Sequence, residues 1–173
     1  MKSKERLIEI NKLKMGHNDL VFSLNDSFLK EMGSTEPMEC EVKANVSIKR
    51  AEHLLELACR FDGTVILTCD ICLDPLRLPL KNEFGLLIRL SETEKYDDDE
   101  IVYITPLTID YDLSQFLFDN LMLSIPPRKT CSMGGKECNS LVLEKMEKLK
   151  HEHDDETEVD PRWEKLKDII NPN

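Results

Sequence analysis

Apolar and polar side chains alternate with a period of two through residues 38–49 of this 173-residue chain. The apolar positions are Cys40, Val42, Ala44, Val46 and Ile48. Successive side chains of a β-strand point to opposite faces, so the pattern predicts an antiparallel strand with one buried and one solvated face.

The alternation resumes in residues 55–61 and stops at Asp62-Gly63, a pair that favours a two-residue hairpin turn because both residues tolerate positive φ. Residues 64–69 are then expected to form the returning strand, and residues 76–90 a long strand after it. Pro79 has no amide hydrogen to donate, so it indicates an edge position or a bulge. These segments together predict a meander of successive antiparallel strands.

Helical periodicity replaces the alternation later in the chain. After a short strand expected at residues 101–104, residues 112–124 place apolar side chains on one helical face, with Asp112 as the expected N-cap. Pro126-Pro127 ends this helix. Residues 140–150 are typical of a charged amphipathic helix.

A terminal helix is predicted at residues 160–170, where Asp160 is the N-cap and Pro161 the first helical residue. The predicted fold class is therefore α+β. It consists of a curved antiparallel β-meander with packed helices in the C-terminal half. A partly closed barrel is the alternative arrangement of the strands. The length suits one domain with a sizeable core.

The net charge of −11 is concentrated in two acidic stretches, a loop at residues 91–100 and a segment at residues 151–160. The remaining residues are balanced, with 22 basic and 22 acidic side chains, so a folded body could still present a basic face. Acidic runs are usually solvated loops or tails. The functional alternative is an acidic arm that pairs with a basic ribosomal protein or imitates nucleic acid.

No stretch of the sequence approaches the roughly 20 apolar residues of a membrane-spanning helix. The first twenty residues interleave basic and acidic side chains and lack the apolar region of a secretory leader. We therefore expect a cytoplasmic protein with no membrane partner. Cytosolic thiols stay reduced, so disulfides are a poor account of the six cysteines.

Four cysteines form two pairs about sixty residues apart. Cys69 and Cys72 form a CxxC at a predicted corner between strands, and Cys131 and Cys138 follow much later. Four thiolates suit a tetrahedral structural zinc site, and such a closed shell leaves no position for a substrate. The expected metal ligands are therefore Cys69, Cys72, Cys131 and Cys138. Uncoordinated thiols are the alternative, because the second pair is spaced more widely than usual.

A thiol-dependent redox enzyme using Cys69 and Cys72 is the competing function. A redox CxxC stands at the start of a helix, which lowers the thiol pKa, whereas Leu73-Asp74-Pro75 argues against a helix here. GxSxG, HExxH and GxGxxG are absent from the sequence, so we predict no catalytic residue and no small-molecule substrate. Cys40 and Cys59 fall on apolar strand faces and are expected to be buried.

Three segments resemble the YceD-like family of bacterial and plastid proteins. They are residues 67–76 around the CxxC, residues 112–126 with the helix that ends at proline, and Asp160-Pro161-Arg162. The resemblance implies a YceD-like domain at residues 36–173 after an N-terminal segment at residues 1–35. It also places the family's cysteines on the two pairs described above.

The family is associated with accumulation of large-subunit ribosomal RNA. The resemblance therefore implies a non-catalytic ribosome-assembly factor for 23S rRNA, whose partner is the rRNA, the pre-ribosomal particle or a basic ribosomal protein. Basic residues near the cysteine corner or on strands leading from it are the candidate RNA contacts: Arg60, Arg77, Lys81, Arg89, Arg128 and Lys129. Ordinary solvated charge is the alternative for these residues, and a protein partner would contact the acidic runs instead.

Overall fold

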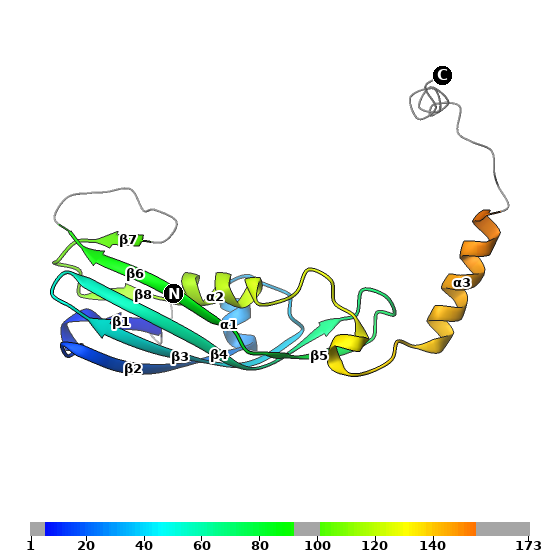
Figure 1. Cartoon of the computed structure of the whole chain (residues 1–173), viewed down its shortest axis with the longest axis horizontal. Helices are drawn as coiled ribbons and strands as arrows, with labels where there is room; N and C mark the ends of the chain where they lie inside the picture. The colour runs from blue at the N-terminus through cyan, green and yellow to red at the C-terminus, as the bar shows by residue number, and fades with distance from the viewer. Residues whose placement is uncertain (1–5, 92–100, 155–173) are drawn as a thin grey trace, which may run out of the picture.

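The structure is a computed structural model that describes residues 6–91 and 101–154. Within these ranges the chain forms a mixed α+β fold built on a six-stranded, mostly antiparallel sheet (Figure 1). Across the sheet the order is β2 (Gly16–Asn25), β3 (Glu39–Arg50), β4 (Leu54–Thr68), β6 (Glu83–Leu90) and β7 (Ile101–Ile104). The sixth strand, β5 (Pro75–Leu80), pairs with β4.

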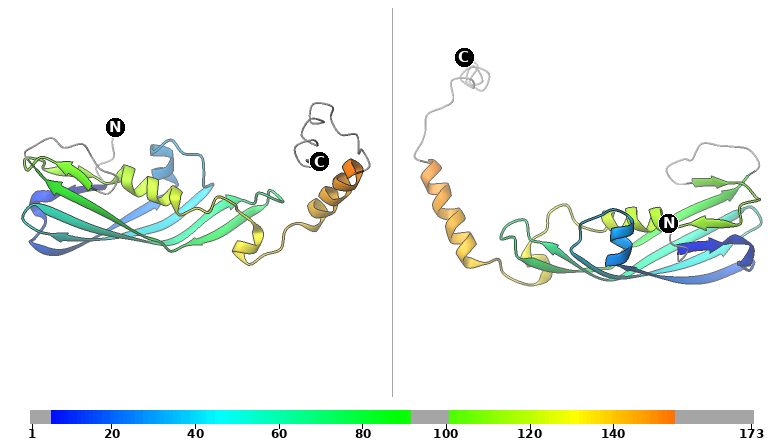
Figure 2. Two further views of the ribbon diagram at one scale, coloured as in Figure 1. Left: turned by 45° about the horizontal axis from the view of Figure 1, so that its top comes forward. Right: turned by 180° about the vertical axis from the view of Figure 1, so that it is seen from behind.

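The remaining elements pack on this sheet or extend from it. β1 (Leu7–Glu9) and β8 (Asp110–Asp112) form a separate antiparallel pair. α1 (Asp26–Glu31) and α2 (Ser114–Leu123) lie over the same face of the sheet (Figure 2). Two short 3-10 helices are η2 (Ile10–Lys12) and η3 (Cys131–Gly134). α3 (Ser140–Asp154) extends away from the sheet beyond η3 (Figure 1).

The main core lies between the sheet and the helices α1 and α2. Alternate residues of β3 and β4 point into it, as the period of two predicts, and Phe28 of α1 and Leu117 of α2 cover them. Complete burial of each such Leu or Phe contributes about 1.5–3 kcal/mol. The opposite face carries mostly polar side chains, because the alternate positions of both strands are charged or polar.

The predicted hairpin turn at Asp62-Gly63 is wrong, because β4 continues through both residues to Thr68. Gly63 does not have a positive φ. Glycine is required at this position because there is no room for a side chain. An added Cβ would lie 2.2 Å from the Glu41 carbonyl oxygen and 2.5 Å from the Val42 Cα of β3. Close approach between β3 and β4 therefore explains the glycine.

The single strand predicted at residues 76–90 is two strands, β5 and β6, which pair with successive lengths of the same edge of β4. They are separated at Lys81-Asn82, where the Asn82 carbonyl oxygen accepts a hydrogen bond of 2.8 Å from the Phe61 amide. Pro79 lies in β5, which pairs with β4 alone, so the expected edge position is confirmed. β2 and β7 end the sheet at opposite edges, so the partly closed barrel is wrong.

The helices predicted near residues 112–124 and 140–150 are confirmed as α2 and α3. The predicted N-cap is wrong by one residue, because Leu113 is the N-cap of α2, but the Asp112 carboxylate still accepts a hydrogen bond of 2.9 Å from the Ser114 amide. The expectation that the helices occupy the C-terminal half and pack on the sheet holds for α2 only. α1 is in the N-terminal half, and most of the apolar side chains of α3 are exposed.

The structure adds elements before residue 36 that the sequence analysis did not predict. β2 pairs with β3 over ten residues, and α1 begins where the Asn25 side chain accepts a hydrogen bond from the Phe28 amide. A six-residue helix is too short to show a clear helical period. The predicted acidic loop beyond Ser91, the predicted acidic segment beyond Asp154 and the helix predicted at residues 160–170 lie outside the described residues. Of the helices in the described ranges, none has the length and apolar character needed to cross a bilayer.

Candidate metal centre

The CxxC forms the tight connection between β4 and β5. The Cys69 amide donates to the Asp74 carbonyl oxygen and the Leu73 amide donates to the Cys69 carbonyl oxygen, both at 3.0 Å. Leu73 has a φ of 63°, rare for a bulky residue, and its side chain is 73% exposed. The expectation that no helix begins at this CxxC is confirmed, since β5 follows it directly.

The segment that carries the second cysteine pair is held against this corner by two hydrogen bonds between Asp70 and Lys129. The Asp70 amide donates to the Lys129 carbonyl oxygen at 2.7 Å, and the Lys129 amide donates to the Asp70 carboxylate at 2.6 Å. Two residues later Cys131 begins η3, which packs on β5. These contacts join the CxxC turn and η3 side by side without the help of a metal ion.

Gly134 and Gly135 allow the wide spacing of the second pair to close. Gly134 touches β5, where an added Cβ would lie 2.6 Å from Leu76 Cδ1 and 2.9 Å from the Arg77 carbonyl oxygen. Gly135 ends η3 with a φ of 71°, in the left-handed region that glycine enters without a steric penalty. The chain then turns back and places Cys138 beside Cys69.

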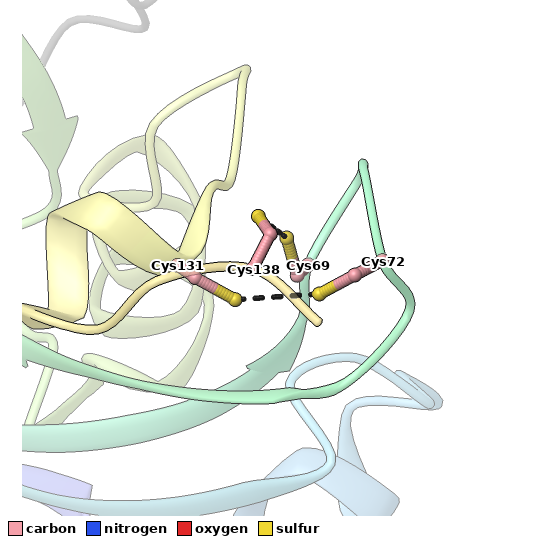
Figure 3. Close-up of side chains that lie close together, drawn as sticks. All are labelled: Cys69, Cys72, Cys131 and Cys138. Atoms are coloured by element: carbon pink, nitrogen blue, oxygen red, sulfur yellow. Dashed lines mark hydrogen bonds between the residues drawn. The ribbon is translucent and has the colours of Figure 1, made fainter. Parts of the chain in front are cut away.

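The four sulfur atoms gather at one point (Figure 3). Cys69 Sγ lies 3.8 Å from Cys138 Sγ, Cys72 Sγ lies 3.4 Å from Cys131 Sγ, and all four sulfurs lie within 4.8 Å of one another. A disulfide needs about 2.05 Å. Four sulfurs at about 2.3 Å from a tetrahedral zinc ion are separated by roughly 3.8 Å. The spacing therefore fits four thiolates around one metal ion.

Hydrogen bonds and burial shift the pKa values of the cluster thiols in different directions. The pKa of Cys69 is lowered to about 6, chiefly because the Cys72 backbone amide donates to its sulfur, while burial acts in the opposite direction. The pKa of Cys131 is raised, first by its hydrogen bond with the Cys72 sulfur and then by burial. Burial is also the main cause that raises the pKa of Cys138. Of these three thiols, Cys69 is the one whose thiolate is favoured.

The cluster has its own small apolar shell, separate from the main core. Cys69, Cys72 and Cys131 are buried there, with Ile71 and Val142 packed against them. This donor set, soft and largely removed from water, can bind a metal ion such as zinc.

Cys40 and Cys59 lie in the main core instead, so the expectation that they are buried is confirmed. Burial raises the pKa of each thiol to about 12. The Cys40 thiol donates to the Leu24 carbonyl oxygen at 3.3 Å. Neither cysteine belongs to the cluster.

The six predicted RNA contacts are not gathered in one place. Arg89 lies opposite the first residue of β4 and Arg77 opposite Ile66, a separation of roughly 40 Å at about 3.3 Å per residue. Arg60 is paired with Glu83 at 2.9 Å. Lys81 is exposed at the break between β5 and β6. These four residues therefore do not form a common basic surface.

The other two candidates lie beside the cysteine cluster. The Lys129 ammonium is 3.3 Å from Glu36 and 3.9 Å from Asp70, so its charge is already paired. Arg128 lines a cleft next to the cluster together with Lys136, which the sequence analysis did not include. The only signal for Lys136 was its position two residues before Cys138.

The sequence was compared with protein families, curated proteins and solved structures. A family model described as "Large ribosomal RNA subunit accumulation protein YceD" matches residues 57–170. The matched range begins within β4 and includes all four cysteines of the cluster. No curated protein and no solved structure matches the chain.

Proposed function

The chain belongs to the YceD family of large ribosomal RNA subunit accumulation proteins, and on this basis we propose that it is a non-catalytic ribosome-assembly factor. It supports accumulation or maturation of 23S rRNA by binding the rRNA, the pre-ribosomal particle or a ribosomal protein. The observation that carries the proposal is the family match over residues 57–170.

The metal of the cysteine cluster is, in this proposal, a structural zinc ion held by Cys69, Cys72, Cys131 and Cys138. The sulfur spacing and the burial of three thiols support it. Four protein ligands complete the tetrahedral shell, so the ion joins the β4–β5 corner to η3 and offers no position for a substrate. Elemental analysis of the purified protein should find one zinc per chain, and iron in its place would contradict the assignment.

Thiol-dependent redox catalysis by Cys69 and Cys72 is the alternative function, and the lowered pKa of Cys69 is the observation in its favour. The β-turn setting and the burial of both thiols weigh against it. Alkylation separates the two proposals. A redox CxxC reacts rapidly in the untreated protein, whereas zinc-bound thiols react only after chelation.

The assembly proposal is tested in cells depleted of this protein, by the ratio of large- to small-subunit rRNA. Wild-type protein should restore the ratio, and the Cys69→Ser/Cys72→Ser variant should not. Cys40→Ala/Cys59→Ala is the matched control, because it removes two buried thiols and leaves the cluster intact.

An unchanged ratio in depleted cells would contradict the assembly proposal. A fall that both variants reverse would leave the assembly role in place and remove the cysteine cluster from it. Protein levels of all variants are compared by immunoblot, since loss of a structural metal lowers abundance as well as activity.

A further inference from the structure

A cleft with a volume of about 710 Å³ lies beside the cysteine cluster, between η3 and the first turns of α3. This volume is within the range of about 300–1,000 Å³ that ligand sites occupy. One wall comes from the CxxC turn through Ile71, and the others come from residues 128–143. The cleft is therefore built on the segments that the cluster joins.

Two basic side chains at the cleft have no partner within residues 6–91 and 101–154. Among the described residues, neither Arg128 nor Lys136 makes a side-chain hydrogen bond or ion pair, and both are exposed. Glu137 is the single carboxylate among the lining residues, so the lining outside the cysteine cluster has one positive charge in excess. The cluster, which Cys138 brings to the cleft, is itself anionic when four thiolates hold Zn²⁺. Lys129, by contrast, is neutralised by two carboxylates. Unpaired cations at a concave surface attract an anionic ligand.

Hydroxyl groups line the same cleft. Thr130 and Ser132 lie 2.9 Å apart through their side-chain oxygens, and Ser140 stands at the start of α3. Arginine, lysine, serine and threonine are the side chains that donate to phosphate oxygens in nucleic-acid complexes. The polar part of the cleft thus fits a phosphodiester backbone.

The remaining lining is apolar and partly open to solvent. Met133 is 44% exposed and Leu143 is 43% exposed. A double helix hides its base faces, whereas an unpaired strand presents bases and riboses that apolar side chains can contact. The cleft combines this surface with cations, so it suits a single strand better than a duplex.

We propose that this cleft binds an unpaired segment of RNA. Arg128 and Lys136 pair with its phosphates, and Met133 contacts a base or ribose. Thr130 and Ser132 are hydrogen-bonded to each other, so the hydroxyl that accepts within this pair donates to a phosphate. The proposal rests on the proposed function, and it names the surface through which the protein holds ribosomal RNA. The lining has no aromatic side chain on which a base could stack, so the contacts to phosphates supply most of the affinity.

Charge reversal tests the cleft in the full-length, zinc-loaded protein. Arg128→Glu/Lys136→Glu is compared with Lys145→Glu/Lys148→Glu, which makes the same change of charge on exposed residues of α3 outside the cleft lining. The probe is a fluorescein-labelled oligouridylate, followed by fluorescence anisotropy over a range of salt concentrations. A hairpin duplex RNA is the second probe.

Wild type should bind the single strand more tightly than the duplex. The cleft variant should lose about tenfold or more in affinity, and its salt slope should fall by about 1.4, since each phosphate contact to a single strand contributes about 0.7. The control variant should stay within about threefold of wild type. Zinc content and thermal unfolding confirm that both variants are folded.

Equal losses in the two variants would overturn the proposal, because they would reflect net charge alone, and so would unchanged binding by the cleft variant. Rescue of depleted cells separates this failure from failure of the assembly proposal. If wild type and the cleft variant both restore large-subunit rRNA, the cleft proposal fails and the assembly role stands. A third outcome is that wild type binds no RNA but restores the rRNA, while the cleft variant does not restore it. In that case the cleft binds a protein, and the RNA assignment is overturned.

Discussion

Replacement of Gly134 by alanine tests whether η3 must lie against β5 for the four cysteines to meet. The φ of Gly134 is outside the left-handed region, so alanine adopts the same backbone without strain. The added methyl group is therefore the whole perturbation. It would lie 2.6 Å from Leu76 Cδ1 and 2.9 Å from the Arg77 carbonyl oxygen, whereas ordinary contact begins at 3.4 Å.

The size of the effect follows from these distances. The end of Leu76 can rotate, although the residue is buried, but the Arg77 carbonyl is backbone of β5, so η3 has to move by about 0.5 Å. Metal sites tolerate about 0.2 Å in their ligand distances. An overpacked contact costs about 1–3 kcal/mol. Because the metal-free chain can relax and the loaded chain cannot, this cost weakens zinc binding by roughly 5- to 150-fold.

The assay is a zinc titration of the full-length protein in competition with a chelator of known affinity. Gly85→Ala is the matched control, because it makes the same substitution in β6, where the nearest atom is the Leu57 carbonyl oxygen at an ordinary 3.8 Å. Its zinc affinity should equal that of wild type. Wild-type affinity in Gly134→Ala, or the same loss in both variants, would refute the argument that contact between η3 and β5 positions the thiolates.

Two further predictions concern the sheet and the buried thiols. Gly63→Ala should lower the free energy of unfolding by more than about 3 kcal/mol, because its Cβ would lie 2.2 Å from a carbonyl oxygen of β3 and both strands are fixed by their pairing. Urea denaturation measures this, with Gly85→Ala expected within about 1 kcal/mol of wild type, and a loss as small as that control's would contradict the packing argument. Cys40 and Cys59, whose pKa burial raises to about 12, should resist iodoacetamide at about pH 8 before and after chelation, whereas Cys69 should react once the metal is removed. Peptide mass spectrometry reads the sites, and early modification of either core cysteine in folded protein would show that its burial is incomplete.

Much of the candidate site could be predicted from residue types. Two cysteine pairs in one chain indicate a four-sulfur cluster even when their spacing is unusual, and the structure brings all four together. The charged surroundings could not be predicted. Arg60 and Arg77 looked equivalent to Arg128 in sequence, yet one is paired with Glu83 and the other lies beside Thr64. Lys136 acquires its place only because Gly134 and Gly135 turn the chain back toward Cys69.

The strand pattern was predictable where both faces of a strand alternate regularly, as in residues 38–49 and 55–61. The Asp62-Gly63 turn was not, because turn propensity is a local preference and β4 follows a twelve-residue pairing with β3 instead. The break between β5 and β6 could not be predicted, because the apolar residues before and after it continue the same period-two alternation.

The sequence by itself determined the period-two faces of the central strands, the helical stretches of α2 and α3, and the set of four cysteines able to hold a metal. These properties depend on neighbours within a few residues. For the residues that the structure describes, the tertiary structure alone decided where β4 continues, that the sheet stays open, and which basic side chains remain unpaired beside the cluster. Each of those outcomes depends on contacts between residues far apart in the chain, such as Gly63 with Val42 and Asp70 with Lys129, and a local pattern carries no information about which distant backbone will be its neighbour.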